Sequence, residues 1–367
     1  ASRVWRWVNL RYLYSEITGY LITFNCFIDS IKKNKKNLIA AEAAANWLIN
    51  KAQFSFGGFK CFELIDKKLN IVDKSLLSYS FDNGVILNGL VNIYKITKKR
   101  KYLKSAIKCA DWILACSKKN GLVKPVYDTS KKKFIFDKKS WSMIPGPYHT
   151  KISIGLYNLY SVIKKKKYIN AADNIINNSI SKQRRDGMFL STANHTNLHP
   201  HCYSAEGIWV AANIFKNEKF YYSVISAFNW IKNNMYKNLP PRLFFLNKKN
   251  IYNYRVDSIS QFLRLMTILN IDKKIEIDER LIKKLMTILL KNNCRSRKKI
   301  LNGGFYWGNQ SNGKKTLCIN TWTTAFTLQS LIYLDLIKSG KNKKINPFYI
   351  VWFWNFMSNY IYSEKHF

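Results

Sequence analysis

Most of the chain consists of segments in which apolar residues recur at helical spacing. In residues 102–115, Leu103, Ile107 and Leu114 share one face with two alanines, while lysines occupy the other faces. A single apolar stripe of this kind predicts a half-exposed helix that packs on a larger core. The other segments with this pattern are 39–49, 168–180, 219–231 and 280–290.

A second set of helical segments is apolar on several faces, which is typical of buried helices. These segments are 17–28, 85–96, 152–163, 208–215, 259–269 and 322–336. They alternate with the half-exposed segments at roughly 50 to 67 residues per pair. The alternation predicts an all-α fold, an (α/α)6 toroid, in which residues 1–367 form a single domain. We expect a last helix near 348–360 to close the ring, whereas closure at the short N-terminal side stays open.

An internal repeat supports this architecture. A polar residue followed by Trp or Asn recurs late in each amphipathic run, at Asn46-Trp47, Asp111-Trp112, Asp173-Asn174 and Asn229-Trp230. Glycine often terminates helices, and glycines follow most of these pairs, at Gly57-Gly58, Gly121, Gly187 and Gly303-Gly304. Strand signals are weak, and residues 133–136 and 242–246 are expected to form short ribbons in loops.

A cluster of polar residues precedes each buried segment. The clusters are Ser15-Glu16, Asp82-Asn83, Tyr148-His149, residues 199–206, Arg255 to Asp257, and Asn320-Thr321. In a toroid, the N-terminal ends of the inner helices meet at one mouth, so these clusters should converge. Helix N-termini favour negative charge, and the mouth therefore suits carboxylates of a substrate or of the protein.

The stretch from His195 to Gly207 holds three of the five histidines. Pro200 suits the first turn of a helix, which places His199 at its beginning. Imidazole, phenol and carboxylate groups gathered in the first two turns suit proton transfer. A polar loop followed by a buried, hydrogen-bonded Glu206 explains the same pattern, and both interpretations stay open.

Composition and charge narrow the classes of protein. Hydrophobic residues make up 47% of the 367 residues, which excludes a disordered chain. The net charge of +40 comes from lysines scattered along the whole sequence, so we expect no nucleic-acid partner. Long-range attraction to an acidic glycan remains compatible with this charge. No apolar run is long enough to form a transmembrane segment.

The seven cysteines are odd in number and lack a framework spacing. We therefore expect free, mostly buried thiols in a reducing compartment, and a cytoplasmic location. No signal peptide is visible, but the chain begins at Ala1 without methionine, so a lost leader stays open. Pro200 breaks the register that would align His195 and His199 for zinc, and we expect no metal ion and no cofactor.

Taken in order, these clusters resemble the VpsJ-type exopolysaccharide-biosynthesis proteins over nearly the whole chain. The matching stretches are Ser15 to Tyr20, Phe81 to Gly84, Tyr148 to Thr150, His199 with Tyr203 to Gly207, Asn320 to Trp322, Gly57 to Phe59 and Gly303 to Phe305. The sequence departs from the family pattern at Asn83, where the family usually has threonine, and around Glu16, where it typically reads Pro-Glu-Thr. The resemblance implies a six-hairpin toroid of the glycoside-hydrolase and polysaccharide-lyase kind, polysaccharide work, and association with biosynthetic machinery.

For hydrolysis of a glycan, Glu206 and Asp82 are the carboxyls that we expect to act as acid and base. Glycoside cleavage needs two carboxyls in unlike environments. Glu16 and Asp257 are the reserves, although helix capping explains Asp82 and Asp257 equally well. A cation beside the buried Glu206 would make it a base, and the absence of a cation would make it a general acid.

Elimination or epimerisation would instead move the proton at C5 of a uronic acid, with His149, His199, His201 or Tyr203 as the catalytic group. Arg255 and Lys151 would then hold the sugar carboxylate. The complete set of expected substrate-binding residues is Glu16, Tyr148, Lys151, His199, Arg255, Asp257, Trp307, Asn320 and Trp322.

The rival hypothesis is a non-catalytic toroid that binds a glycan or acts as a scaffold in an exopolysaccharide assembly machine. An enzyme requires at least two carboxyl or imidazole groups close together at a pocket. We therefore expect Asp82, His149, His201 or Tyr203, Glu206 and Arg255 to line one cavity, whereas a scaffold would scatter them in helix caps.

Overall fold

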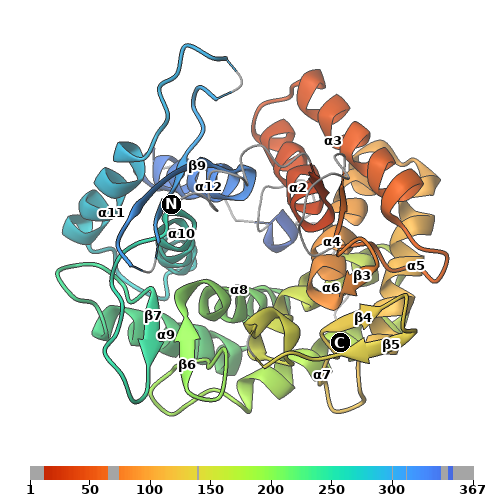
Figure 1. Cartoon of the computed structure of the whole chain (residues 1–367), viewed down its shortest axis with the longest axis horizontal. Coiled ribbons are helices and arrows are strands. Elements are labelled where there is room, and N and C mark those ends of the chain that lie inside the picture. The colour runs from red at the N-terminus through yellow and green to blue at the C-terminus, as the bar shows by residue number, and fades with distance from the viewer. Residues whose placement is uncertain are drawn as a thin grey trace.

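Two concentric layers of helices form the chain (Figure 1). The computed structural model describes residues 12–64, 74–138, 140–299, 301–310, 312–339 and 346–349. The inner helices are α2 (Ser15–Ile31), α4 (Ser80–Thr97), α6 (Thr150–Ile163), α8 (Leu198–Phe215), α10 (Val256–Ile271) and α12 (Thr321–Lys338). The outer helices are α3 (Lys35–Trp47), α5 (Arg100–Cys116), α7 (Lys166–Ile180), α9 (Glu218–Asn233) and α11 (Glu279–Lys291). The predicted (α/α)6 toroid is confirmed.

Burial follows the two hydrophobic patterns. Every residue of α4 from Ser80 to Ile93 is buried, whereas α5 buries one face and exposes Lys104 and Lys108. One boundary differs from the prediction, because α8 begins at Leu198 rather than at Pro200. Within the described residues, no helix combines the length and the apolarity that crossing a bilayer requires.

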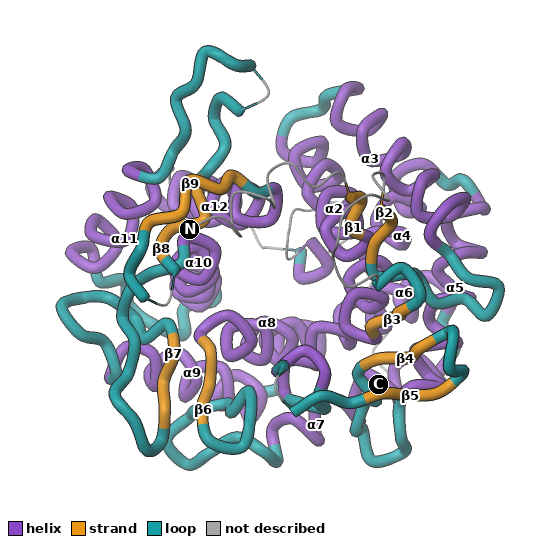
Figure 2. Tube along the Cα trace, in the orientation of Figure 1, coloured by secondary structure: helices purple, strands orange, loops and turns teal. Residues whose placement is uncertain are grey.

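Short antiparallel ribbons lead into several inner helices (Figure 2). The paired strands are β1 (Tyr12–Tyr14) with β2 (Phe62–Leu64), β3 (Leu77–Tyr79) with β4 (Val126–Asp128) and β5 (Lys133–Ile135), β6 (His195–Asn197) with β7 (Leu243–Phe245), and β8 (Tyr306–Asn309) with β9 (Lys315–Ile319). The strands β1, β3 and β6 end directly before α2, α4 and α8. They therefore hold the N-terminal ends of these helices, and β5 and β7 lie where the sequence predicted ribbons.

Glycines let neighbouring inner helices touch backbone to backbone. A Cβ atom at Gly19 of α2 would lie 2.9 Å from Cα of Ile86 in α4, and one at Gly207 of α8 would lie 2.4 Å from the carbonyl of Thr150 in α6. Real Cβ atoms do not approach backbone this closely, so only glycine fits these positions. The helix ends that carry the polar clusters are thereby drawn into a tight ring.

The outer helices are joined by a repeated contact, which explains the glycines of the sequence repeat. Gly57, Gly121 and Gly187 all have positive φ, and each lies against a carbonyl of the next outer helix. The contacted carbonyls belong to Lys108, Asn174 and Ser226. Each repeat unit therefore buries the end of its outer helix on its neighbour.

Gly121→Ala is expected to lower the free energy of unfolding by about 3–5 kcal/mol, because it combines backbone strain with a steric clash. The residue has a φ of +81°, and an added Cβ would lie 1.9 Å from the carbonyl oxygen of Asn174. Gly313→Ala is the matched control, since its φ is +84° and nothing lies within 4 Å of the added carbon. The control should cost only about 1–2 kcal/mol. If urea unfolding shows the same loss of stability for both variants, the contact between Gly121 and Asn174 does not contribute to the stability of the fold.

The far end of the ring, opposite the polar clusters, is covered by residues 346–349. The carbonyl of Phe348 accepts hydrogen bonds from Nδ2 of Asn88 at 2.9 Å and of Asn92 at 3.1 Å. Asn158 on α6 donates to the side-chain oxygens of both asparagines at 2.8 Å. Only this turn of the predicted last helix, Pro347–Tyr349, falls within the described residues.

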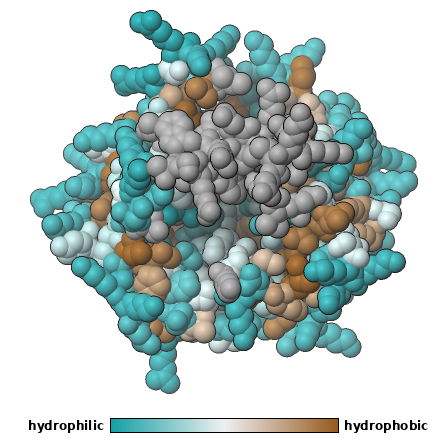
Figure 3. Space-filling view, in the orientation of Figure 1, coloured by the Kyte–Doolittle hydropathy of each residue, from teal (hydrophilic) through white to brown (hydrophobic). Residues whose placement is uncertain are grey.

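Hydrophilic side chains project around the whole outline of the face in Figure 3. Exposed lysines come from many elements of the chain, such as Lys104 of α5, Lys131 and Lys273. The exposed lysines of the described residues therefore belong to separate elements rather than to one basic stripe, in line with their distribution in the sequence.

Candidate functional site

The N-terminal ends of the inner helices meet around an aromatic cluster that is separate from the main core. Its buried members are Tyr20, Phe81, Val85, Tyr148, Tyr203 and Phe326. The ring centroids of Phe81 and Tyr203 lie 4.9 Å apart, and those of Tyr20 and Phe326 lie 5.3 Å apart. The members come from α2, α4, the turn Pro147–His149, α8 and α12, so residues far apart in the sequence converge here. We call this end of the ring the mouth.

The described residues enclose a small cavity below the mouth. A cavity of about 10 Å³ lies between α2, α4 and α6, and its lining includes Tyr20, Asn88 and Lys151. A space of this size holds about one water molecule. This cavity is therefore too small to hold a sugar ring, and the described groups that can contact a glycan are those at the mouth.

Glu16 and Asp82 are a pair of carboxyls in the first turns of the adjacent helices α2 and α4. Asp82 is only 4% exposed, and its Oδ2 atom has no hydrogen-bond partner among the described residues. Burial, and then the charge of Glu16, raise the pKa of Asp82 well above its ordinary value. Burial also raises the pKa of Glu16 to about 7, against the lowering effects of a hydrogen bond with Tyr14 and of Lys151. This pair therefore retains protons close to neutral pH.

Glu206 is fully buried in α8 and binds two cations. Lys151 of α6 donates to Oε2, and Arg264 of α10 donates to Oε1 through Nη2 and, at 2.9 Å, through Nε. Arg264 also donates to Oε1 of Gln329 at 2.5 Å. Burial favours the protonated form of Glu206, but the two cations outweigh it and bring its pKa below the ordinary value. Glu206 is therefore an ionised carboxylate and cannot act as a general acid.

This cluster corrects the role expected for Lys151. Its side chain is 3% exposed and its charge is balanced by Glu206, so it does not reach out to a sugar carboxylate. Burial lowers the pKa of Lys151 to about 8, although Glu206 opposes this shift. Sequence reasoning missed Arg264, although its signal was present: Arg264 is the only charged residue in the apolar run 259–269. A lone arginine on a buried face requires a buried partner.

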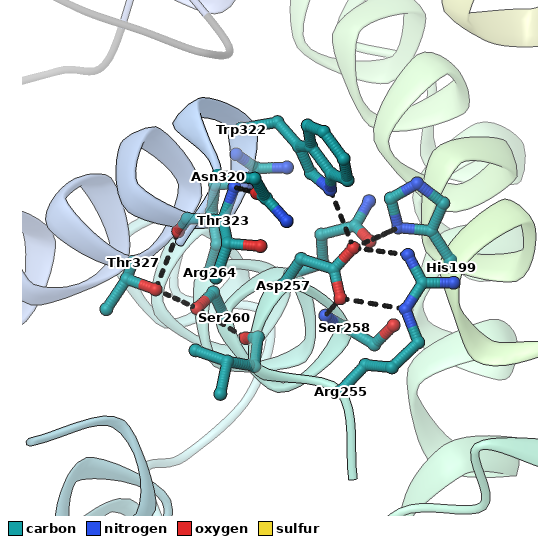
Figure 4. Close-up of polar contacts among 12 residues, drawn as sticks. His199, Arg255, Asp257, Ser258, Ser260, Arg264, Asn320, Trp322, Thr323 and Thr327 are labelled. Carbon is teal, nitrogen blue, oxygen red and sulfur yellow. Dashed lines mark hydrogen bonds and ion pairs between the residues drawn. The ribbon is translucent and has the colours of Figure 1, made fainter. Parts of the chain in front are cut away.

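Asp257, in the first turn of α10, is the centre of a second polar group (Figure 4). Arg255 donates to Oδ1 through Nε at 3.1 Å and to Oδ2 through Nη2 at 2.5 Å. The indole N–H of Trp322 donates to Oδ2 at 3.1 Å. Burial favours the protonated form of Asp257, yet Arg255 and His199 bring its pKa below the ordinary value. Asp257 is therefore a carboxylate that orients Arg255 and Trp322, two of the expected substrate-binding residues.

His199 lies beside this group at the mouth (Figure 4). Its Nδ1 donates to Oε1 of Gln261 at 2.5 Å and lies 3.8 Å from Oδ2 of Asp257. Its ring contacts those of Tyr203 and Trp141. Burial lowers the pKa of His199 to about 4, so the ring is neutral at pH 7. The hydrogen bond through Nδ1 leaves Nε2 without a proton and able to accept one.

His201 points away from the mouth, which corrects its expected catalytic role. The N–H of Phe189 donates to Nδ1 at 3.2 Å, and Nε2 donates to the carbonyl of Ala227 at 3.1 Å. Both nitrogens are thus bound to backbone between α8 and the outer layer. The physical reason is helical geometry, since residues two apart, such as His199 and His201, point to different faces. Among the described residues, no three His, Cys, Asp or Glu side chains are grouped to hold a metal ion.

Three other expected residues have structural contacts. His149 accepts from the N–H of Gly146 at 3.3 Å, and burial lowers its pKa to about 3. The hydroxyl of Tyr148 donates to the carbonyl of Ile144 at 2.9 Å, which leaves its ring in the aromatic cluster. Asn320 caps α12 by accepting from the N–H of Thr323 at 2.8 Å. His149 is therefore neutral, and the hydroxyl of Tyr148 and the side-chain oxygen of Asn320 are already bound.

Comparison with known proteins places this geometry in context. The family profile described as glycosyl hydrolase family 76 matches residues 27–220. None of the curated protein sequences matches the chain. Similar solved structures include the cellobiose 2-epimerase of Bacillus thermoamylovorans, with 14% identity, 88% of each chain covered and a TM-score of 0.69.

Two further structures share the fold. A D-mannose isomerase has 11% identity and a TM-score of 0.68, with 89% of this chain and 88% of that chain covered. The GH76 alpha-mannanase of Bacteroides thetaiotaomicron has 16% identity and a TM-score of 0.53, with 65% of this chain and 66% of that chain covered. At identities this low, the similarity shows a shared fold and nothing about activity. The family profile covers more than half of the chain, including α4, α6 and α8, and on this basis the chain belongs to glycosyl hydrolase family 76.

Proposed function

We propose that the chain is an enzyme that hydrolyses a glycosidic bond of an oligo- or polysaccharide at the mouth of the ring. The observation that carries this proposal is the carboxyl pair of Glu16 and Asp82, whose pKa values are both raised. Membership of a glycoside hydrolase family supports a carbohydrate substrate. The aromatic rings around the pair supply flat apolar surfaces suited to sugar rings.

The pair can supply both an acid and a base. Burial raises the pKa values of both carboxyls, and the charge of Glu16 raises that of Asp82 further. Two coupled carboxyls of this kind keep a proton near neutral pH, so one can donate while the other accepts. We assign Glu16 as the general acid, because its pKa of about 7 leaves it protonated in slightly acidic solution. Asp82 is the second carboxyl, and its unpartnered Oδ2 is available to a water molecule or to the sugar.

Glu206, first paired with Asp82 on sequence grounds, has a different place in this proposal. It binds Lys151, and the charge of Lys151 in turn lowers the pKa of Glu16. Glu206 is therefore a positioning residue that acts through Lys151. Burial, and then the charges of Glu16, Glu206 and Asp257, raise the pKa of the Tyr203 phenol, which supports one connected site.

Turnover is expected to fall as pH rises through about 7, because the general acid Glu16 then loses its proton. To test this, the protein is incubated with a panel of polysaccharides and new reducing ends are measured. The rate of hydrolysis is then recorded as a function of pH on any substrate that is cut. Failure to cut any member of a broad panel, or a rate that stays constant from slightly acidic to alkaline solution, would contradict the proposal.

His199 favours a second candidate function, elimination or epimerisation. Its Nε2 is unprotonated and lies at the mouth beside Asp257 and Tyr203, so it can accept a proton from a sugar carbon. Product analysis separates the reactions. An unsaturated product detected by ultraviolet absorbance, or a changed epimer without new reducing ends, would favour His199 over the carboxyl pair. Binding without any product would favour the non-catalytic scaffold.

The biological setting is also part of the proposal. The ordered series of motifs supports a place close to the VpsJ-type proteins, beside machinery that makes exopolysaccharide. We further infer one domain over residues 1–367, in keeping with a single ring of alternating helices. All seven cysteines lie in the described residues as free thiols, and six are buried, which supports a reducing compartment such as the cytoplasm.

A further inference from the structure

Two arginines flank one tryptophan at the rim of the mouth. The guanidinium carbons of Arg242 and Arg255 lie 5.3 Å and 4.9 Å from the ring centre of Trp307. Arg242 follows α9, Arg255 caps α10, and Trp307 belongs to β8, so three separate segments build the group. Like charges repel, and two guanidiniums on one ring are stable only with compensating contacts or a bound anion.

The two arginines differ in what balances their charge. Arg255 is bound to Asp257 through two hydrogen bonds. Arg242 has no carboxylate partner among the described residues, and its hydrogen bonds there all come from Nη1, to Asn253 at 3.2 Å and to the carbonyl of Asn309. Arg242 is half-buried, and Arg255 is 20% exposed, so a ligand can reach both. The indole N–H of Trp307 is buried and has no partner within the described residues, which leaves a third donor beside them.

We propose that Arg242, Arg255 and Trp307 form a subsite for an anionic group on the glycan, either the carboxylate of a uronic acid or a sulfate or phosphate ester. Guanidinium groups bind such oxyanions with paired hydrogen bonds, and an oxygen of the anion or of its sugar can accept from the indole N–H. This inference rests on the proposed function, because it names the substrate class of the same site. It assigns the substrate to the acidic glycans.

The charges of the whole mouth support an anionic ligand. At and directly below the mouth, the described cations are Lys151, Arg242, Arg255 and Arg264, and the carboxylates of lowered pKa are Glu206 and Asp257. Burial keeps the histidines of the site neutral at pH 7, and the pKa values of the remaining carboxyls are raised. Positive charge is therefore in excess even with Glu16 partly ionised.

The general lysine richness of the chain does not explain this excess. The sequence has 61 lysines and arginines, of which twelve are arginines, yet three of the four described cations at and directly below the mouth are arginines. Arginine is the residue suited to oxyanions, because it offers several donors in a planar fork and stays charged when buried. Burial lowers the pKa of Arg242 to about 10, so it remains charged at neutral pH.

The test measures the melting temperature of the whole chain with sodium glucuronate, sodium sulfate, glucose and decathymidylate, each against sodium chloride at the same ionic strength. Glucuronate or sulfate at about 100 mM should raise the melting temperature by about 2–4 °C, and glucose should not. The two anions distinguish a carboxylate subsite from an ester subsite. Arg242→Gln should abolish the rise, and Arg242→Lys should retain part of it.

Arg280→Gln is the matched control, since it removes the same charge from an exposed residue in the first turn of α11, at the far end of the ring. It should leave the rise intact. An equal rise in Arg242→Gln and Arg280→Gln, no rise with either anion, or an equal rise with glucose would overturn the proposal. A larger rise with decathymidylate that Arg242→Gln removes would also overturn it, in favour of nucleic acid.

The proposal of an anion subsite can be rejected independently of the proposal that Glu16 and Asp82 are catalytic. Glu16→Gln should keep the wild-type rise with glucuronate or sulfate, because Glu16 lies on α2 and makes no contact with Arg242. If the protein cuts a neutral glycan and neither anion raises its melting temperature, the subsite is rejected and the hydrolase proposal stands. An Arg242-dependent anion effect without turnover of any glycan would reject the hydrolase and leave the subsite.

Discussion

Glu206→Gln is expected to lower the free energy of unfolding by about 3–5 kcal/mol, a large part of the stability of an ordinary domain. Glu206 is the only carboxylate bound to Lys151 and Arg264 among the described contacts. An amide keeps the shape but cannot neutralise two buried cations. Arg264 cannot lose its proton, so a charge stays buried without compensation. Urea unfolding at neutral pH measures the loss.

Two comparisons show whether burial causes this loss. Asp186→Asn removes a surface ion pair with Arg184, of 3.6 Å, in which both side chains are nearly half exposed, and it should cost less than about 1 kcal/mol. The double variant Lys151→Met with Glu206→Gln should lose less stability than the sum of the two single variants. Removing Lys151 also removes one of the buried charges that Glu206→Gln leaves unpaired. A stable Glu206→Gln protein without turnover would instead make Glu206 a functional carboxylate.

The pH dependence of stability has a definite sign. The pKa of Glu206 is lower in the folded protein than in an unfolded chain. Its ion pairs therefore stabilise the fold above the unfolded pKa, and this stabilisation disappears as the pH falls through the folded value. Glu206→Gln should remove this part of the acid sensitivity.

Glu16→Gln and Asp82→Asn are each expected to reduce turnover by about 10²–10⁴-fold, the range associated with a general acid or base. Neither change should destabilise the protein above neutral pH. Burial raises the pKa of Asp82, so its ionisation works against folding, and a neutral amide removes that cost. Measured rates and melting temperatures of the same samples separate a catalytic effect from unfolding.

Glu218→Gln is the control for these variants. Like Glu16, Glu218 lies in the first turn of a helix, but it belongs to the outer helix α9, where it is exposed and paired with Lys274. It should keep wild-type turnover. If Glu16→Gln and Asp82→Asn also keep it, the carboxyl pair is not the catalytic centre, and His199 becomes the first residue to replace.

The alternation of helices could be predicted from the sequence, because a helix buried on one face has one apolar stripe and a helix buried on several faces is apolar nearly all round. The all-round apolar run of α4 and the striped run of α5 are examples. The polar clusters could be placed at one mouth for the same reason, since the fold class determines where inner helices begin. The start of α8 was two residues off, because Leu198 can begin a helix ahead of Pro200.

Charge partners could not be read from the sequence. Lys151 and Glu206 are separated by 55 residues, and Glu206 and Arg264 by 58, so their meeting depends on how α6, α8 and α10 pack. The close approach allowed by Gly207 decides that packing. Sequence reasoning therefore left open whether Glu206 is an acid or a base, and it did not include Arg242 or Arg264 in the site.

The sequence by itself determined the two-layer helical ring, its repeat and the end at which polar residues gather, because helical periodicity and helix ends are local properties. Only the tertiary structure decided which of those residues share a site. It paired Glu16 with Asp82, bound Glu206 to two cations and turned His201 away. The reason is that pKa values and ion pairs depend on burial and on distances of a few ångströms between helices, which no local pattern records.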